Sequence, residues 1–306
     1  MSPRTMGILA KPMLFSTAII WGTSFFIMKN ALDVIPVFYL LTIRFMAGTV
    51  LLGLVAWKQW KEFDRGYIWR GALMGGMLFM AFAVQTFGLS YTTPSKNAFL
   101  TAVYCVLVPF MIWAVAKIRP DRYNILAALL CVAGVGLVSL NETLTINLGD
   151  LLTLISAFFY AGHITTVAKV APGRNIILLT VVQFFFTGTY ALIGGLLAET
   201  FPAQALMDPG VLFPIAYLCV MATTLALLFQ NIGQMWSDPA STAIILSLES
   251  VFGVLFSVLF YGDQVTGRLL LGFALIFVGV LCSETKFSFL HKGKPVEEEV
   301  PTQIET

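Results

Sequence analysis

Ten long apolar stretches make up most of this chain, and their lengths are those of helices that cross a lipid bilayer. A spanning helix needs about 20 mostly apolar residues, with about 17–25 observed. The stretches run over residues 12–28, 34–57, 71–95, 97–116, 123–140, 151–168, 175–198, 209–237, 239–262 and 269–283. The connections between them are too short to hold a soluble domain. We therefore expect an all-α integral membrane protein with ten transmembrane helices.

The composition excludes the other broad classes of protein. Apolar residues make up 58% of the 306 residues and charged residues only 11%, whereas a soluble domain is roughly 45–50% apolar. Disordered chains are poor in apolar residues, and this one has 26 Phe. The net charge of +2 gives no electrostatic footprint for nucleic acid.

The four cysteines show no sign of a disulfide framework or of a metal site. Each lies inside an apolar stretch, and they share no C-x-x-C or histidine spacing of the kind that zinc sites use. They are interpreted as small packing residues, and the sequence predicts neither a metal nor a cofactor.

The distribution of Lys and Arg predicts the orientation in the membrane, because cytoplasmic loops carry an excess of these residues. With the amino terminus inside, the outer loops hold only Lys29, Lys96 and Arg268. The inner side holds Arg4, Lys11, Lys58, Lys61, Arg65, Arg70, Lys117, Arg119, Arg122, Lys169, Arg174, Lys286, Lys292 and Lys294. Both termini are therefore expected in the cytoplasm.

An internal repeat divides the chain into two halves of five helices. One series of matches is 145 residues apart: Gln85 with Gln230, Gly88 with Gly233, Pro94 with Pro239 and Ala98 with Ala243. Another is 140 residues apart: Gly22 with Gly162, Lys29 with Lys169, Gly48 with Gly188 and Thr49 with Thr189. We expect one repeat over residues 12–141, a second over 148–285, and a disordered cytoplasmic tail over 286–306.

The second repeat should be inverted, because five helices leave the chain on the opposite side of the membrane. The loops agree, since the connection after the second stretch holds four basic residues and its counterpart after the seventh holds none. Inverted repeats related by a pseudo-two-fold axis place a site at the middle of the membrane, which opens to either face as the halves rock. This architecture favours a transporter, although a fold alone does not fix function.

Several short motifs, in their order along the chain, resemble a known family. They are Trp21-Gly-Thr-Ser-Phe25, Arg44-Phe45, Thr93-Pro-Ser-Lys-Asn-Ala-Phe-Leu100, Val106-Leu-Val-Pro109, Gly149-Asp-Leu-Leu152, Ile244-Ile-Leu-Ser-Leu-Glu249, Tyr261-Gly-Asp263 and Gly272 through Gly279. The chain resembles the drug/metabolite transporter superfamily, with two EamA-type domains over about residues 12–285. The resemblance implies a multi-pass protein of the cell inner membrane that exports amino acids, metabolites or drugs.

The resemblance also implies a cavity among helices 1, 3, 4, 6, 8 and 9, with helices 5 and 10 at the periphery. In the family, the acid at the position of Glu249 is commonly followed by Pro, and here Ser250 stands instead. This departure leaves open whether the ninth helix is kinked there.

Three ionisable side chains lie inside the predicted spans, where each costs on the order of 2.5–3.5 kcal/mol by insertion scales. Glu249 is a candidate for proton coupling or for binding a substrate ammonium, or else an acid that fastens its helix to a neighbour. Arg44 is a candidate ligand for a substrate carboxylate, but a structural role is preferred, by snorkelling or by bonding to helix-end carbonyls. His163 is a candidate proton relay, with a bond to a neighbouring side chain preferred.

Other polar and aromatic residues complete the candidate solute-binding set. Gln85 and Gln230 are symmetry mates, and an amide inside a span needs a hydrogen-bond partner or a wet cavity. The candidate set is Trp21, Gln85, Asn97, Tyr104, Tyr160, Gln230 and Glu249. Packing, capping or interhelical bonding is the alternative for the aromatic residues and for Asn97.

Four prolines are candidates for hinges or gates. Pro94 and Pro239 each follow a capping side chain, a pattern that starts a helix, and plain capping is the preferred interpretation. Pro109 and Pro214 lie inside spans, where each leaves a backbone carbonyl without its helical partner.

The prediction is a secondary transporter that exports small organic solutes by alternating access, with the bilayer, a solute and perhaps protons as partners. An antiporter of phosphorylated sugars is the first alternative, but it needs several basic residues at cavity depth, and only Arg44 lies deep in a span. A membrane-embedded enzyme is the second, but no two acids within the spans lie near one another and no H-E-x-x-H motif occurs. The sequence does not predict the substrate, the coupling or the oligomeric state.

Overall fold

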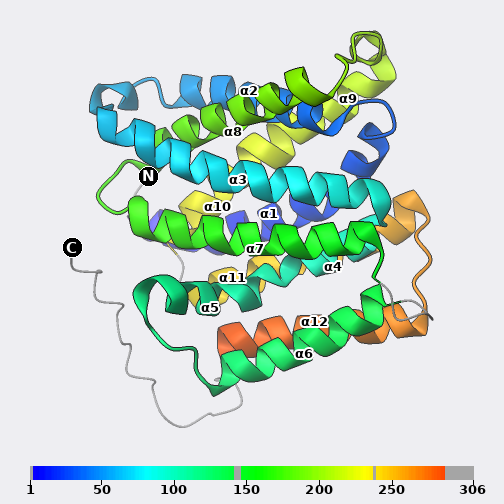
Figure 1. Ribbon diagram of the computed structural model, residues 1–306. Helices are drawn as coiled ribbons and strands as arrows, with labels where there is room; N and C mark the ends of the chain where they lie inside the picture. The colour runs from blue at the N-terminus through cyan, green and yellow to red at the C-terminus, as the bar shows by residue number, and fades with distance from the viewer. Residues whose placement is uncertain (1–2, 141–145, 237–238, 287–306) are drawn as a thin grey trace.

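The computed structural model describes residues 3–140, 146–236 and 239–286, which form an all-helical bundle (Figure 1). The first repeat consists of α1 (Pro3–Ala31), α2 (Val37–Val55), α3 (Arg65–Tyr91), α4 (Pro94–Ala102), α5 (Tyr104–Ala116) and α6 (Arg122–Ser139). The second consists of α7 (Leu148–Val170), α8 (Ile176–Ala198), α9 (Pro209–Tyr217), η3 (Leu218–Leu225), α10 (Ala226–Met235), α11 (Pro239–Phe256), η4 (Ser257–Tyr261) and α12 (Gly267–Thr285). Two single turns, η1 (Gln59–Glu62) and η2 (Ala205–Met207), lie in connections.

These elements make ten spans, as the sequence predicts. Nine helical segments of the described chain are long and apolar enough to cross a membrane, and the tenth has its apolar part at Ile245–Tyr261. The fourth span is divided into α4 and α5, and the eighth into α9, η3 and α10. The all-α fold with two five-helix repeats is confirmed.

Three spans contain irregular turns that the sequence does not locate. The fourth span is interrupted at Val103, whose N–H reaches back only three residues, to the Leu100 carbonyl at 3.4 Å. The eighth passes through the π-helix η3, which ends where the Ala226 N–H bonds the Met221 carbonyl. The ninth continues unbroken through Glu249 and becomes a π-helix only at η4, so no kink occurs at the departure from the family motif.

Helix packing follows the symmetry of the repeat. Three pairs join a span to its own mate in the other repeat: α2 with α8, α4 with α11, and α6 with α12. The remaining large contacts come in matched sets, since α3 packs on α7 as α1 packs on α10, and α1 packs on α11 as α5 packs on α7. The halves are therefore interlocked about a pseudo-two-fold axis and are not separate bodies.

Glycines allow the closest approaches between the repeats. A Cβ added to Gly134 in α6 would lie 2.7 Å from the Gly272 carbonyl oxygen in α12, and one on Gly272 would lie 3.0 Å from the Gly134 oxygen. In the same way, a Cβ on Gly149 in α7 would lie 2.6 Å from the Gly88 oxygen in α3. Small residues at such crossings let the backbones of membrane helices touch.

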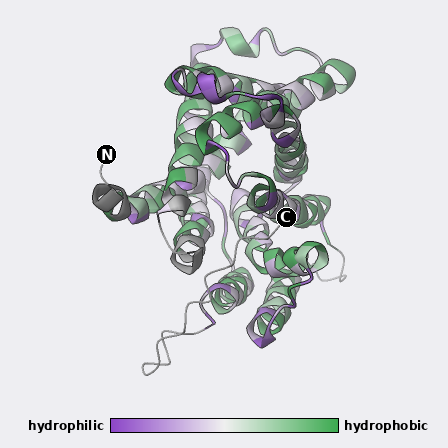
Figure 2. Cartoon of the chain, turned by 90° about the vertical axis from the view of Figure 1, so that its left-hand side faces the viewer, coloured by the Kyte–Doolittle hydropathy of each residue, from purple (hydrophilic) through white to green (hydrophobic). Residues whose placement is uncertain are grey.

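The outer surface of the bundle suits lipid. Large apolar side chains are exposed on its outward helices, among them Leu129 and Val132 of α6, Leu197 of α8 and Leu270 of α12. Viewed from the end where the termini lie, most of the helical ribbon is hydrophobic (Figure 2).

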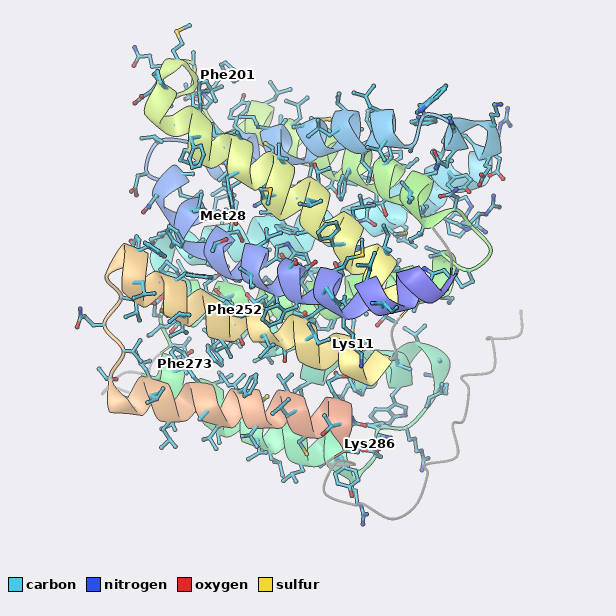
Figure 3. The ribbon with its side chains drawn as sticks, turned by 180° about the vertical axis from the view of Figure 1, so that it is seen from behind. Lys11, Met28, Phe201, Phe252, Phe273 and Lys286 are labelled. Carbon is cyan, nitrogen blue, oxygen red and sulfur yellow. The ribbon has the colours of Figure 1, made fainter. Side chains whose placement is uncertain are left out.

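The two ends of the bundle are named here by the chain termini. The start of α1 and the end of α12 lie at one end, the terminal face (Figure 1), and Figure 3 shows Lys11 and Lys286 toward that end. The connections α1–α2, α3–α4, α6–α7 and α11–α12 lie at the other end, the opposite face (Figure 1).

Candidate functional site

A cavity of about 80 Å³ lies between the two repeats and is lined by both of them. The first repeat supplies Trp21, Ser24, Phe25, Met28, Arg44, Leu78, Phe82, Gln85, Thr101 and Tyr104. The second repeat supplies Tyr160, His163, Ile164, Leu227, Gln230 and Glu249. The cavity has room for several water molecules and is smaller than the roughly 300–1,000 Å³ of pockets for drug-sized ligands. A solute therefore has to be small, or the walls have to separate around it.

The helices that line this cavity are those implied by the family resemblance, with one addition. Lining residues come from spans 1, 3, 4, 6, 8 and 9, and none of the described ones comes from α6 or α12. The addition is span 2, which contributes Arg44. Of the seven candidate solute-binding residues, six line the cavity: Trp21, Gln85, Tyr104, Tyr160, Gln230 and Glu249.

Gln85 organises one wall of the cavity. The Tyr160 hydroxyl donates to Gln85 Oε1 at 2.7 Å, and Gln85 Nε2 donates to Thr101 Oγ1 at 2.9 Å. These two bonds connect α3 to α7 and to α4, and the Gln85 side chain is only 4% exposed. Its symmetry mate Gln230 reaches the same cavity from α10.

Asn97 departs from the expectation, because it lies outside the cavity lining. Its Nδ2 donates to the Gln85 carbonyl oxygen at 3.3 Å and to Thr153 Oγ1 at 2.7 Å, so the side chain fastens α4 to α3 and α7. Asn97 is fully buried, one helical turn before Thr101. The rotation of α4 presents Thr101 to the cavity and turns Asn97 into the contact between helices.

Arg44 projects into the cavity from α2 and is 2% exposed. Its Nε donates to Thr223 Oγ1 in η3 at 3.1 Å, and one terminal nitrogen points at the Met28 sulfur at 3.1 Å. The guanidinium carbon lies 5.2 Å from the centre of the Phe82 ring. Arg44 therefore neither snorkels nor bonds to helix-end carbonyls within the described residues.

Glu249 lines the cavity from α11 and is 4% exposed. Among the described residues, no Lys or Arg nitrogen lies within 4.0 Å of its carboxyl oxygens. Tyr104, its symmetry mate, also lines the cavity, and its ring centre lies 5.9 Å from that of Tyr160. Only one of the two mates carries an acid.

The remaining ionisable and aromatic candidates also reach the cavity. His163 lines it from α7, and its Nε2 is buried without a hydrogen-bond partner in the part of the chain that the structure describes. Trp21 lines it from α1, with Nε1 donating to the Ala222 carbonyl in η3 at 2.9 Å. The π-helix η3 thus holds both Trp21 and Arg44 in place, and π-helical turns often occur at functional sites.

The four candidate prolines all lie outside the described lining of the cavity. Pro94 begins α4, capped by Thr93 Oγ1, which accepts from the Lys96 N–H at 3.3 Å. Pro109 lies inside α5, and Pro214 lies inside α9 just before η3. Pro239 begins α11, but its capping neighbour at position 238, like the tail over 287–306, is outside the described residues.

At the opposite face, charged side chains fasten the start of α4 to the second repeat. Lys96 Nζ lies 3.3 Å from Asp150 Oδ2, and the Asp150 carboxylate is fully buried and also accepts from Thr92 Oγ1 at 2.5 Å. The Ser95 N–H donates to Asp263 Oδ2 at 3.0 Å. Both acids belong to the second repeat, so this face is closed by contacts between the repeats.

Some lining residues were missed by sequence reasoning. Thr101 had a usable signal, because it lies four residues after Asn97 on the same side of a helix. Phe82 and Met28, which surround Arg44, had none in a chain so rich in apolar residues.

The fold and the cavity define a class of protein: a multi-pass membrane protein with two inverted repeats around a small polar site. The model of the EamA-like transporter family matches residues 8–140 and again 147–285. A protein of Archaeoglobus fulgidus named an uncharacterized transporter is 30% identical over 264 residues, covering 86% of this chain and 82% of its own. A second of the same name and organism is 26% identical over 255 residues, covering 80% and 86%.

The chain therefore belongs to the EamA-like transporter family. A solved crystal structure has the same fold, with a TM-score of 0.66 at 17% identity, covering 92% of this chain and 98% of that one. The expected family, the multi-pass membrane fold and the transporter class are thus confirmed.

Proposed function

We propose that this protein exports small organic solutes, such as amino acids or related metabolites, by alternating access through the central cavity. The observation that carries the proposal is the cavity itself, which takes polar residues from both interlocked repeats, including the symmetric pair Gln85 and Gln230. A site between inverted repeats opens to one face or the other as the repeats rock.

The opening at the opposite face requires contacts between the repeats to break. Those contacts are the Lys96–Asp150 ion pair and the bond from the Ser95 N–H to Asp263. Pro94 lies beside them at the start of α4, so this helix start is the proposed gate. Pro109 and Pro214 are the proposed hinges inside the fourth and eighth spans.

The terminal face is proposed to be cytoplasmic, with the protein in the inner membrane. Support comes from the basic residues in the connections at that face, which cytoplasmic loops favour. Residues 12–141 and 148–285 are the proposed repeat units, with the tail over 286–306 in the cytoplasm.

Glu249 is the proposed site of proton coupling, with His163 as a proton relay. Glu249 is the one carboxylic acid among the described lining residues, and His163 lies on the wall contributed by α7. An ionisable side chain buried in a membrane cavity is a proton-relay candidate by its placement.

Two alternatives are less well supported. An antiporter of phosphorylated solutes needs several cations around the phosphate, and Arg44 is the one Arg or Lys among the described lining residues. A membrane-embedded enzyme needs a pair or cluster of acids or metal ligands, whereas the described part of the cavity holds one acid.

The test uses purified protein in liposomes preloaded with the twenty protein amino acids, with efflux followed by mass spectrometry with and without an imposed pH gradient. We expect protein-dependent loss of particular amino acids that responds to the gradient. In Glu249→Gln the response should vanish, whereas it should persist in Glu284→Gln, a control in α12 outside the described lining. Normal flux of the Glu249 variant at every pH would make Glu249 structural, and no amino-acid efflux from folded wild type would refute the proposed substrate class.

A further inference from the structure

The guanidinium of Arg44 is a buried cation without a counter-ion. No carboxylate of the described residues lies within 4.0 Å of it. A guanidinium has five N–H donors, and the bonds of Arg44 to described residues are one to the Thr223 hydroxyl and one to the sulfur of Met28, a weak acceptor. Burying a charge is costly unless it is paired. Arg44 is thus held in place by neutral neighbours while much of its binding capacity for an anion is free.

Glu249 presents the complementary case in the same cavity. Its carboxyl has no Lys or Arg of the described chain within 4.0 Å, and Arg44 is included in that statement. Glu249 comes from α11 in the second repeat, and Arg44 comes from α2 in the first. Tyr160, which lines the cavity from α7, interacts electrostatically with both charges. The cavity therefore holds two opposite charges that face one solute site and are not paired with each other.

The net charge of a solute decides how well it fits such a cavity. A solute that is only a cation leaves Arg44 unpaired and lies close to a second positive charge. An anion leaves Glu249 unpaired and is repelled by it when that carboxyl is ionised. A zwitterion pairs both charges at once, and like-charge juxtaposition inside an interface costs several kcal/mol.

We propose that Arg44 and Glu249 are the two charge-selective anchors of the solute site: Arg44 binds the carboxylate of a zwitterion, and Glu249 binds its ammonium group. This inference rests on the proposed transport function and adds the residues that set its specificity. Arg44 presents its donors in a fixed fork, the geometry that recognises a carboxylate with two bonds. The stacking on Phe82 and the bond to Thr223 fix the plane of that fork before the solute arrives.

The test is a binding experiment on the full chain in lipid nanodiscs, read by thermal stabilisation and by the fluorescence of Trp21 in the cavity. The probes are each of the twenty amino acids that wild type exports, its amide as a cation-only analogue, and its N-acetyl derivative as an anion-only analogue. Wild type should bind the amino acid about tenfold or more tightly than either analogue, since a hydrogen bond to a charged group contributes about 1.5–3 kcal/mol. A wild type that prefers either analogue would overturn the proposal.

The variants separate an anchor from a structural role. Arg44→Gln should weaken the amino acid by about 10- to 100-fold and leave the amide unchanged, whereas Glu249→Gln should weaken the amino acid and leave the N-acetyl derivative unchanged. Arg70→Gln at the terminal face and Glu284→Gln in α12 are matched controls and should leave all three affinities unchanged. Equal weakening of the amino acid and of the amide in Arg44→Gln would overturn the anchor while leaving transport intact.

A variant that does not fold still leaves a decision. If Arg44→Gln cannot be purified, Arg44→Lys keeps the positive charge and should retain the preference for the amino acid over its amide, though with lower affinity. Loss of that preference in the folded lysine variant would overturn the proposal. Export of amino acids by wild type without any zwitterion preference would refute the anchors alone, whereas absence of amino-acid export would refute the proposed function as well.

Discussion

Replacing Gly134 with alanine tests the packing of the α6–α12 pair without touching the cavity. The new Cβ would lie 2.7 Å from both the Gly272 carbonyl oxygen and Ile276 Cγ1, and 3.0 Å from the Ile276 backbone nitrogen. Two of these three neighbours are backbone atoms, so a change of rotamer cannot relieve the contact. The helices have to move apart by about 0.5 Å or more to restore ordinary van der Waals distances.

The expected cost follows from opposing contributions. Overpacking of this kind costs about 1–3 kcal/mol, while replacing a glycine inside a helix gains about 0.5–1 kcal/mol. Gly134→Ala should therefore lower the free energy of unfolding by about 1–2 kcal/mol. Gly136→Ala is the matched control in the same helix, because its Cβ would meet only Leu140 Cδ1, at an ordinary 3.7 Å. That control should leave the stability unchanged or raise it slightly.

The assay is thermal unfolding of both variants in one detergent, followed by tryptophan fluorescence, together with amino-acid efflux per folded molecule. The melting temperature should fall by a few degrees in Gly134→Ala, since about 1 kcal/mol shifts it by about 2–4 °C in chains of 150–250 residues. Efflux per folded molecule should stay unchanged, because no described lining residue comes from α6 or α12. Equal melting temperatures for the two variants would refute the packing argument, and lost efflux in a stable Gly134→Ala would refute the peripheral role of this pair.

Three further perturbations have expected outcomes. Gln85→Ala and Gln230→Ala should each weaken apparent solute affinity in efflux assays, and unchanged affinity in both would place these amides in packing. Lys96→Met leaves a buried carboxylate without its counter-ion, at a cost of up to about 3 kcal/mol; it should lower the melting temperature, and neutralising the carboxylate as well should restore part of it. Asp64 accepts a hydrogen bond from Arg174, which lowers the pKa of its carboxyl; its stabilisation is present above the unfolded pKa of about 3.9 and is lost as the pH falls through the lower folded value. Asp64→Asn keeps the cap of α3 and should melt slightly lower than wild type from pH 8 to pH 5, and a gap that widened on acidification would contradict the sign.

The sequence was sufficient to predict the layout of the spans and their pairing. Apolar length alone gives ten crossings, and the repeat identifies the mates that pack together. Gly48 and Gly188 illustrate this, because they match in the repeat and lie in the paired helices α2 and α8. A Cβ on Gly48 would meet the Phe184 ring at 3.1 Å, and one on Gly188 would meet Met46 at 3.0 Å. Small residues at matched positions thus pointed to a contact on the symmetry axis.

The rotation of each helix about its own axis was not predictable in the same way. Sequence position gives the depth of a residue in the membrane, but the side it faces depends on the packing of neighbouring helices. Asn97 and Arg44 show the two errors that follow. Asn97 was expected in the cavity and instead joins helices, whereas Arg44 was assigned a preferred structural role and instead faces the cavity. The turns at Val103 and η3, which set these rotations, depend on tertiary contacts.

The charges of the site break the symmetry that the packing keeps. The repeat mate of Glu249 is Tyr104, and the residue 140 positions after Arg44 is Phe184, which is fully buried in the apolar core. Each repeat therefore supplies one proposed anchor, of opposite sign. A ligand shifts a conformational equilibrium only through its different affinity for the two states. A solute held by both anchors bridges the repeats, and it favours the closed cavity over one in which the repeats have moved apart. A solute held by one anchor gains nothing from closure, so the same pair of residues that selects a zwitterion would also couple its binding to the movement of the repeats.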